Sequence, residues 1–447
     1  MPRLASSWAG GDWQDWSKLP RTMLLIHNLG EVATPQGSSP RRGPDQGKVL
    51  RQRGAEVVCQ DGKILFVGTP EERIRLFGEL ADSEKLDGRG GTLIPGFVDP
   101  HTHLPWAGTR EEEFMARLAG TTYQEIAAKG GGILSTVAST RRATEEELAA
   151  NVLRRMDHML ACGTTTAEAK SGYGLTLGDE LKQLRAIRAA TAVHPVDLVP
   201  TLLAAHEVPP EYREKGGQHR GRYVDLICDT IVPATAEAGL ARFCDVFCEH
   251  GVFSAEESRR VLEAGVRHGL APRLHADEFA DSGGAELAAQ LGAFSADHLM
   301  AVSDAGIDAL AGSGVTAVLL PGTSFFLMKK IYAPARRLVQ AGVPVALATD
   351  CNPGSSHTES MPMIVVLAVI QLGLTIEESL TAATLNAACS LGLGAEIGSI
   401  ETGKRADLVL LDAPNLLHLA YHYGVNPVAA VVKGGRVAFR AATRGLA

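Results

Sequence analysis

The chain has 447 residues, of which 45% are hydrophobic and 21% are charged, and its formal net charge is −8. This composition is typical of a globular protein, and the excess of acidic residues gives no support for a nucleic-acid or acidic-membrane partner. No apolar run approaches the ~18 to 20 residues that span a bilayer, which excludes a membrane protein. The length suffices for one barrel of about 250 residues with an accessory domain.

The seven cysteines are an odd number and show no paired CxxC spacings. A disulfide framework or a structural zinc finger is therefore not indicated, and buried thiols are the expected state. The N-terminus has no continuous apolar stretch followed by a cleavage site of small residues, so it does not resemble a secretory signal. Together these features predict a cytoplasmic protein.

The first part of the chain predicts an irregular arm followed by β structure. Residues 1–22 carry three of the four tryptophans without any periodicity, and we expect them to form an extension or flexible arm. The apolar run 23–28 predicts a strand, and the stretch 35–46, rich in Pro, Gly and Ser, predicts a loop. Residues 55–67 predict a hairpin, because an Asp-Gly turn separates two β-rich runs.

The middle of the chain alternates short β-rich runs with helical segments. Capping boxes from Thr144 to Glu147 and from Ser254 to Glu257 predict where two of these helices begin. The alternation favours a (β/α)8 TIM barrel; the alternative is an open doubly wound sheet, which no G-x-G-x-x-G motif supports. The eight predicted strands are 97–103, 164–170, 197–203, 245–249, 272–275, 294–298, 315–320 and 345–350.

The last fifty residues return to short β-rich runs, and a Gly-Gly turn there is typical of a hairpin. Because both chain ends are β-rich around a different middle, we expect one small β-sandwich-like domain built from both. Its predicted extent is 23–95 together with 396–447, and the barrel is predicted over 96–395.

Polar side chains gather where the predicted strands end, which in such a barrel is where active sites form. His101 and His103 are two residues apart on a predicted strand, so both imidazoles lie on one face, about 6.6 Å apart along the chain, and can bind one cation. Neutral imidazole suits zinc or iron, and a carboxylate commonly completes such a site, for which His275 and Asp350 are available. The polar residues at strand ends are His101, His103, Lys170, His206, Glu249, His275, His298 and Asp350.

Several short runs of the sequence carry a family resemblance. These runs are 95–110 (PGFVDPHTHLPWAGTR), 130–137 (GGGILSTV), 164–174 (TTTAEAKSGYG), 275–278 (HADE), 296–298 (ADH), 348–356 (ATDCNPGSS), 403–409 (GKRADLV) and 421–424 (YHYG). They resemble the metal-dependent amidohydrolase superfamily and, within it, the imidazolonepropionase family. The resemblance covers roughly residues 23 to 440, and the ATDCNPGSS and KSGYG runs are highly specific.

The resemblance implies an enzyme of histidine degradation. Its substrate would be the small molecule 4-imidazolone-5-propanoate, whose cyclic amide is hydrolysed to N-formimidoyl-L-glutamate by a metal-activated water that attacks the ring carbonyl. One Zn²⁺ or Fe³⁺ per chain is implied, since imidazole and carboxylate serve both metals. The ligands implied for this metal are His101, His103, His275 and Asp350.

The resemblance also implies roles for other residues. Asp350 would accept the proton of the attacking water, Glu278 would carry it to the leaving nitrogen, and His298 would polarise the carbonyl or assist the water. The guanidinium of Arg110 has the fork geometry that suits the propanoate carboxylate. The expected substrate-binding residues are Arg110, Tyr173, His206, Glu278, Asn352, Gly354 and Ser355.

Simpler interpretations exist for several of these residues. Arg110 could pair with Glu111–Glu113 on a solvated helix face, and His206 could be a hydrogen-bonded core histidine. Lys170 could be a catalytic amine, but a structural ion pair explains it better. A second metal is disfavoured, because no lysine ends the fourth predicted strand, although Glu249 does.

Two alternative functions compete with ring hydrolysis. A mononuclear deaminase of the cytosine or guanine type shares the same pattern of ligands, but a neutral base gives it no need for Arg110. A catalytically silent binding scaffold would have lost a ligand or Glu278, and none is missing. The resemblance further implies a homodimer. It suggests no role for Tyr421 and His422.

Overall fold

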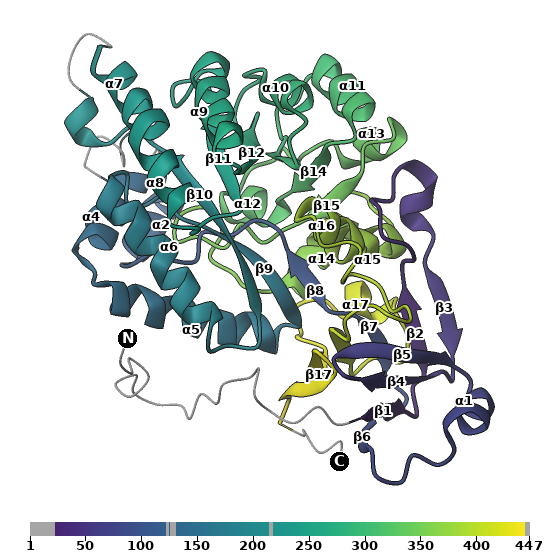
Figure 1. The fold of residues 1–447 in the computed structure, drawn as a ribbon. Coiled ribbons are helices and arrows are strands. Elements are labelled where there is room, and N and C mark those ends of the chain that lie inside the picture. Colours follow the sequence, from purple (N-terminus) through teal and green to yellow (C-terminus); the bar gives the residue numbers. More distant parts are fainter. Residues whose placement is uncertain (1–22, 122–124, 126–130, 214–217, 443–447) are drawn as a thin grey trace.

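Eight parallel strands lie side by side in chain order within the residues that the computed structural model describes, which are 23–121, 125, 131–213 and 218–442 (Figure 1). An isolated parallel bridge between Thr102 and Cys351 joins the segments that follow the first and last strands, so the barrel is nearly closed. The predicted (β/α)8 architecture is confirmed. The strands are β8 (Phe97–Asp99), β9 (Thr164–Lys170), β10 (Asp197–Ala205), β11 (Phe243–Cys248), β12 (Ala271–Ala276), β13 (Ser295–His298), β14 (Thr316–Leu319) and β15 (Val345–Leu347).

The first and last barrel strands are shorter than the sequence predicted. His101 and His103 lie beyond the end of β8, and Asp350 lies beyond the end of β15. The two segments still pair with each other, because Asp350 N donates to His101 O at 3.1 Å and His103 N donates to Cys351 O at 3.0 Å. The barrel therefore closes through the stretch of chain that carries the predicted metal ligands.

Helices follow the strands and surround the barrel (Figure 1). Both predicted capping boxes are present: Thr144 accepts from Glu147 N at the start of α5, and Ser254 accepts from Glu257 N at the start of α9. The helices are α2 (Glu111–Leu118), α4 (Ile133–Arg142), α5 (Glu145–Ala161), α6 (Leu177–Thr191), α7 (Gln218–Leu226), α8 (Val232–Glu237), α9 (Ala255–Arg267), α10 (Gly284–Leu291), α11 (Asp304–Ser313), α12 (Pro321–Phe326), α13 (Ala335–Gln340), α14 (Met361–Ile370), α15 (Ile376–Ala383) and α16 (Leu385–Ser390).

Two further sheets lie beside the barrel and combine both ends of the described chain (Figure 1). Their strand orders are β5-β4-β1-β6 and β18-β17-β16-β7-β2-β3, in which β16 from the C-terminal part pairs with β7 from the N-terminal part. The predicted hairpins are β4–β5 and β17–β18, and both are confirmed. The elements are β1 (Leu24–His27), β2 (Glu31–Thr34), η2 (Gly43–Gly47), β3 (Leu50–Arg53), β4 (Glu56–Gln60), β5 (Lys63–Gly68), α1 (Pro70–Phe77), β6 (Glu84–Asp87), β7 (Thr92–Pro95), β16 (Leu408–Leu411), α17 (His418–Tyr421), β17 (Val428–Lys433) and β18 (Arg436–Arg440).

The two chain ends share one apolar core, which explains why they fold together. Leu24 and Leu93 from the first part pack in the same cluster as Leu408 and Val432 from the last part. Burying these side chains against each other removes apolar surface from water at both ends of the chain. The boundaries 23–95 and 396–447 of this domain stay a prediction, and the tryptophan-bearing residues 1–22 lie outside the described part.

Lys433 forms ion pairs that link the small domain to the barrel. Its Nζ lies 2.8 Å from Asp407 Oδ2 and 2.7 Å from Asp197 Oδ2 at the start of β10.

All seven cysteines are unpaired and five of them are buried, as expected for buried thiols. Among the described residues, no helix is both long enough and apolar enough to cross a membrane.

Candidate metal centre and active site

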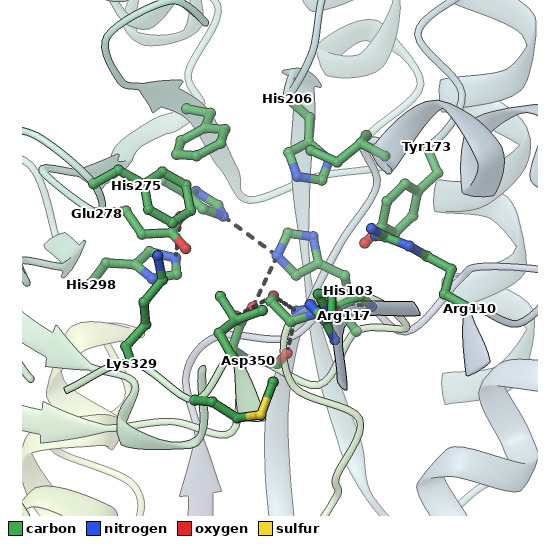
Figure 2. Close-up of a pocket in the computed structure, with 18 of the residues that line it drawn as sticks. His103, Arg110, Arg117, Tyr173, His206, His275, Glu278, His298, Lys329 and Asp350 are labelled. Carbon is green, nitrogen blue, oxygen red and sulfur yellow. Dashed lines mark hydrogen bonds and ion pairs between the residues drawn. The ribbon is translucent and has the colours of Figure 1, made fainter. Parts of the chain in front are cut away.

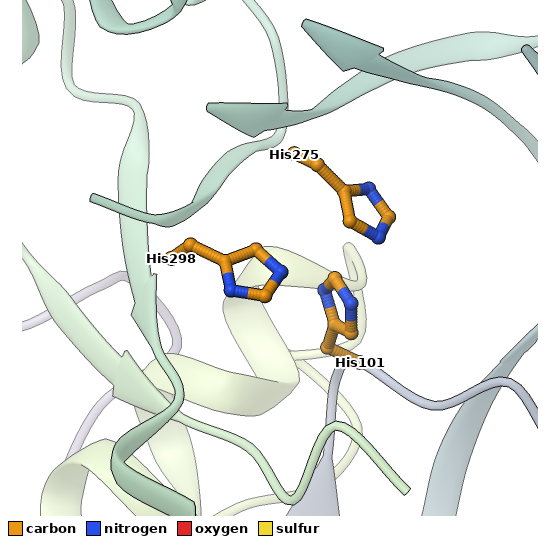
Figure 3. A group of neighbouring side chains, drawn as sticks. All are labelled: His101, His275 and His298. Carbon is orange, nitrogen blue, oxygen red and sulfur yellow. The ribbon is translucent and has the colours of Figure 1, made fainter. Parts of the chain in front are cut away.

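Four side chains from distant parts of the chain lie close together at the carboxyl end of the barrel. Figure 2 shows His103, His275 and Asp350, and Figure 3 shows His101 beside His275. Oδ1 of Asp350 lies 3.5 Å from Nε2 of His101 and 3.4 Å from Nε2 of His103. Nε2 of His103 in turn lies 3.4 Å from Nε2 of His275, which extends from β12. The donor atoms of His101, His103 and Asp350 therefore lie within 4.8 Å of one another, and His275 adjoins this group through His103.

These separations suit a metal ion. Donor atoms that surround a tetrahedral ion at about 2.1 Å stand about 3.4 Å from one another. Nε2 of His101 is also buried and has no hydrogen-bond partner among the described residues, and an unsatisfied buried lone pair is costly unless a cation binds it. The donor set of imidazole and carboxylate fits zinc or iron.

Two buried carboxylates orient the ligand histidines. Oδ2 of Asp297 lies 2.7 Å from Nδ1 of His101, and Oδ1 of Asp245 lies 3.1 Å from Nδ1 of His275. A carboxylate at Nδ1 keeps the proton there and leaves the Nε2 lone pair free for a metal. Burial lowers the pKa of His101 and of His103 well below the usual imidazole range, so both rings stay neutral, as metal ligands must be.

His298 lies beside the same point. It forms with His101 and His275 a second group of possible ligands, whose donor atoms all lie within 4.8 Å of one another (Figure 3). Burial lowers the pKa of His298 to about 3, and neither ring nitrogen has a hydrogen-bond partner among the described residues. Its backbone φ is +76°, and Asp350 has φ +55°; such strained non-glycine positions are concentrated at functional sites. The ring is therefore available to a bound molecule.

Glu278 lies beside His298, with its Oε2 3.8 Å from Nε2 of His298. Burial raises the pKa of Glu278 well above the usual range, and the negative charges of Asp350 and Glu249 raise it further. A carboxyl group whose pKa is raised in this way can hold a proton and donate it to a bound molecule.

The loop after β15 fixes Asp350. Oδ2 of Asp350 accepts from Thr323 Oγ1 at 2.7 Å and from Ser355 Oγ at 3.3 Å, which leaves Oδ1 to face the histidines. Asn352 shapes the same loop, because its Oδ1 accepts from the backbone N–H groups of Gly354 and Ser355, both at 2.8 Å. The sequence analysis missed Thr323, which lies 27 residues before Asp350.

A cavity of about 430 Å³ opens above the four predicted ligands (Figure 2). On one wall His206 stacks on His103 with ring centroids 5.1 Å apart, and the ring of Tyr173 is 5.9 Å from that of His103. All seven predicted substrate-binding residues line the cavity. The lining consists of His103, Arg110, Arg117, Thr121, Ile133, Tyr173, His206, Phe247, His275, Glu278, Phe279, His298, Leu327, Met328, Lys329, Asp350, Asn352, Gly354 and Ser355.

Arg110 both forms an ion pair with a nearby glutamate and lines the cavity. It pairs with Glu113, whose Oε2 lies 2.8 Å from both Nε and NH2 of the guanidinium. Yet its side chain is only 8% exposed and lines the cavity rather than a solvated helix face. The guanidinium packs so closely on Gly354 that a Cβ at that position would displace it.

Three polar strand-end residues do not line the cavity, namely the proposed ligand His101, Lys170 and Glu249. Nζ of Lys170 lies 2.6 Å from Glu168 Oε1 and 2.6 Å from Asp245 Oδ2, which is the buried ion pair that the sequence favoured. The carboxylate of Glu249 accepts at 2.8 Å from the backbone N–H groups of His250 and Phe279, so it holds a loop.

Sequence reasoning missed several residues that the structure brings to this region. Asp245 and Asp297 are carboxylates inside apolar strands, and this is a usable signal, because such groups are rarely buried without a partner. Arg117 lies seven residues after Arg110, on the same face of α2, and its NH1 donates to Gly354 O at 3.1 Å. The helical period alone could have pointed to Arg117.

Comparison with known proteins gives close sequence relatives. The profile of the amidohydrolase family matches residues 92–438. An imidazolonepropionase from Symbiobacterium thermophilum is 52% identical over 415 residues, which cover 93% of this chain and 96% of the relative. An imidazolonepropionase from Geobacillus kaustophilus is 52% identical over 420 residues, covering 93% of this chain and 97% of the relative.

Solved structures share the fold at low sequence identity. A 5-methylcytosine deaminase from Klebsiella pneumoniae, liganded with phosphonocytosine, has a TM-score of 0.70 at 18% identity and covers 94% of this chain and 99% of its own. An adenosine deaminase from Xanthomonas campestris with bound zinc has a TM-score of 0.66 at 21% identity and covers 93% and 92%. The family profile and the sequence relatives together show that this chain belongs to the amidohydrolase family and, within it, to the imidazolonepropionases.

Proposed function

We propose that this chain is an imidazolonepropionase that hydrolyses the cyclic amide of 4-imidazolone-5-propanoate to N-formimidoyl-L-glutamate. The close sequence relatives support the reaction. The observation that carries the chemistry is the convergence of three imidazoles and one carboxylate below a cavity of about 430 Å³. One Zn²⁺ or Fe³⁺ per chain would be held by His101, His103, His275 and Asp350.

The ion, when bound, would supply Lewis acidity, which polarises a carbonyl oxygen and lowers the pKa of water from 15.7 towards ~7. The protein's own residues would move the protons. Asp350 is placed to accept the first proton, because it touches the ligand histidines and is held by Thr323. Glu278 would then deliver that proton to the ring nitrogen as the carbon–nitrogen bond breaks and the water oxygen stays on the carbonyl carbon.

The neutral ring of His298 would steady the carbonyl oxygen as negative charge develops on it. The ring is buried, lies next to Glu278, and has both nitrogens without a hydrogen-bond partner among the described residues. A donor fixed at the position where charge develops costs no reorganisation during the reaction.

The cavity walls would hold the substrate between the ion and Arg110. Glu113 contacts the Nε and NH2 edge of the guanidinium and so orients it, while NH1 faces Gly354. Tyr173 and His206 also line the cavity and would flank the flat ring, whereas Asn352, Gly354 and Ser355 would contribute backbone and amide contacts.

The proposed reaction is tested by following the absorbance of 4-imidazolone-5-propanoate with the purified chain, with cytosine and guanine as control substrates. We expect consumption of the imidazolone and no deamination of either base. Turnover of cytosine or guanine with an inert imidazolone would instead support the deaminase alternative, whose solved examples share this fold.

Replacing Arg110 with alanine is expected to raise KM for the imidazolone by about 10- to 150-fold, because a charge-assisted contact to the propanoate is worth about 1.5–3 kcal/mol. Arg110→Lys keeps the positive charge but not the fork geometry, so its KM is expected to lie between those of the wild type and Arg110→Ala. The matched control is Arg142→Ala, an exposed arginine on α4 outside the cavity. Steady-state kinetics measure these KM values. An unchanged KM in Arg110→Ala would show that Arg110 does not bind the substrate.

Elemental analysis of the purified chain is expected to find close to one zinc or iron per chain. The geometry supports one ion, since Glu249, the carboxylate that a second metal would need, already accepts two backbone N–H groups. Two equivalents bound with similar affinity would contradict the single centre.

We also propose a cytoplasmic homodimer. The seven unpaired cysteines support a reducing compartment. Exposed apolar side chains at Leu417, Tyr421 and Tyr423 support an interface between copies. Light scattering coupled to size exclusion should give twice the chain mass of 47.3 kDa, and a stable monomer would contradict the dimer.

A further inference from the structure

A cluster of five charged side chains lies directly beneath the ligand histidines, and the proposed mechanism does not use it. Every member is fully buried. Two are cationic and three are anionic, so the cluster carries one excess negative charge on the side of the imidazoles. The members are Glu168, Lys170, Asp245, Arg273 and Asp297.

Lys170 connects the carboxylates of this cluster. Its Nζ lies 2.6 Å from Glu168 Oε1, 2.6 Å from Asp245 Oδ2 and 3.8 Å from Asp297 Oδ2. Arg273 supports the arrangement from the other side, with NH2 3.4 Å from Asp297 Oδ2 and 2.8 Å from the carbonyl oxygen of Pro100. No other lysine contributes to this cluster in the described residues.

Two of the carboxylates contact both Lys170 and a ligand histidine. Asp245 offers Oδ2 to Lys170 and Oδ1 to Nδ1 of His275 at 3.1 Å. Asp297 offers Oδ2 to Nδ1 of His101 at 2.7 Å, within reach of Lys170. Lys170 is therefore connected through one carboxylate each to two of the four proposed ligands, His275 and His101.

The contacts show how the cation positions these carboxylates. Nζ of Lys170 engages Oδ2 of Asp245, which leaves Oδ1 of Asp245 facing Nδ1 of His275. A carboxylate that accepts the Nδ1–H group holds the imidazole in the orientation and tautomer that leave its Nε2 lone pair free. The position of Lys170 therefore directs these lone pairs towards the ion.

We propose that Lys170 is a positioning residue of the metal centre: acting through Asp245 and Asp297, it fixes His275 and His101 with their Nε2 lone pairs directed at the ion. The inference rests on the metal centre of the proposed function. It assigns to this lysine a part in metal affinity in addition to its part in stability.

The test compares Lys170→Met with Lys433→Met. Lys433 is the matched control, because it is also a buried lysine between two carboxylates, Asp407 and Asp197, but lies in the small domain away from the ligands. Both variants should melt at a lower temperature than the wild type. The zinc dissociation constant, measured by competition with a chelator, is expected to rise about 10- to 100-fold in Lys170→Met and to stay unchanged in Lys433→Met.

A charge-balanced variant serves if Lys170→Met does not fold. Lys170→Met/Glu168→Gln removes one cation and one anion together, and is expected to show the same loss of zinc affinity. Wild-type zinc affinity in a folded Lys170 variant, or an equal loss in Lys433→Met, overturns the inference alone. A wild-type chain that binds no zinc or iron overturns the proposed metal centre as well, so the two failures are distinguishable.

Discussion

Replacing Glu278 with glutamine is expected to lower the turnover number by about 10²–10⁴-fold while the bound metal stays in place. Glutamine matches the shape of the side chain but cannot pass the proton that Asp350 accepts from water on to the leaving nitrogen. The wild-type carboxyl group is suited to this task, because burial and the neighbouring charges of Asp350 and Glu249 raise its pKa. Kinetics together with elemental analysis of the same preparation measure both quantities.

Glu249→Gln is the matched control for this variant. Glu249 is equally a buried carboxylate at the carboxyl end of the barrel, but its oxygens accept backbone N–H groups and it does not line the cavity. We expect its loss of turnover to stay under about tenfold, because Glu249 does not line the cavity and the amide oxygen can still accept one of the two N–H groups. Normal turnover in Glu278→Gln would rule out the proton transfer that we assign to this residue.

Replacing Asp350 with asparagine is expected to have the larger effect, a loss of about 10⁴-fold or more in kcat/KM together with weaker metal binding. The change removes the only carboxylate among the four proposed ligands, and without a firmly bound ion the pKa of water returns towards 15.7. Asparagine is the appropriate substitute, because Asp350 has a backbone φ of +55° and asparagine tolerates this conformation. Chelator competition measures the affinity, and kinetics in excess zinc measure what remains.

Thr323→Val separates the charge of Asp350 from its orientation. The threonine donates to Asp350 Oδ2 at 2.7 Å, and valine removes this bond while keeping the carboxylate. A smaller loss than in Asp350→Asn is expected, in the range of about 10- to 100-fold in metal affinity. Full activity and metal content in Asp350→Asn would contradict its place among the ligands.

The fold and the substrate are decided by different parts of the molecule. Deaminases named for adenosine, 5-methylcytosine and guanine share the fold at 16–21% identity, so the barrel itself does not determine which substrate is hydrolysed. In this chain, Arg110 and Arg117 bring two guanidinium groups to the cavity wall beside Gly354. A carboxylate on the substrate would form ion pairs with these arginines.

The sequence by itself determined the features that depend on neighbours along the chain. The capping boxes at Thr144 and Ser254 join residues three apart, and the two hairpins join residues across a short turn, so local patterns were enough to predict them. The alternation of strands and helices likewise predicted the barrel. The polar residues at the strand ends predicted where its chemistry lies, because a parallel barrel brings those ends together.

Only the tertiary structure decided which groups face each other across the barrel. Asp297 orients His101 from 196 residues away, and Asp245 reaches Lys170 across 75 residues. No period or motif encodes such pairs, because they depend on the depth and rotation of each strand in the closed sheet. The same holds for the early ends of β8 and β15, where barrel closure replaces regular strand pairing. Side chains far apart in the sequence act together because the folded barrel brings them into contact.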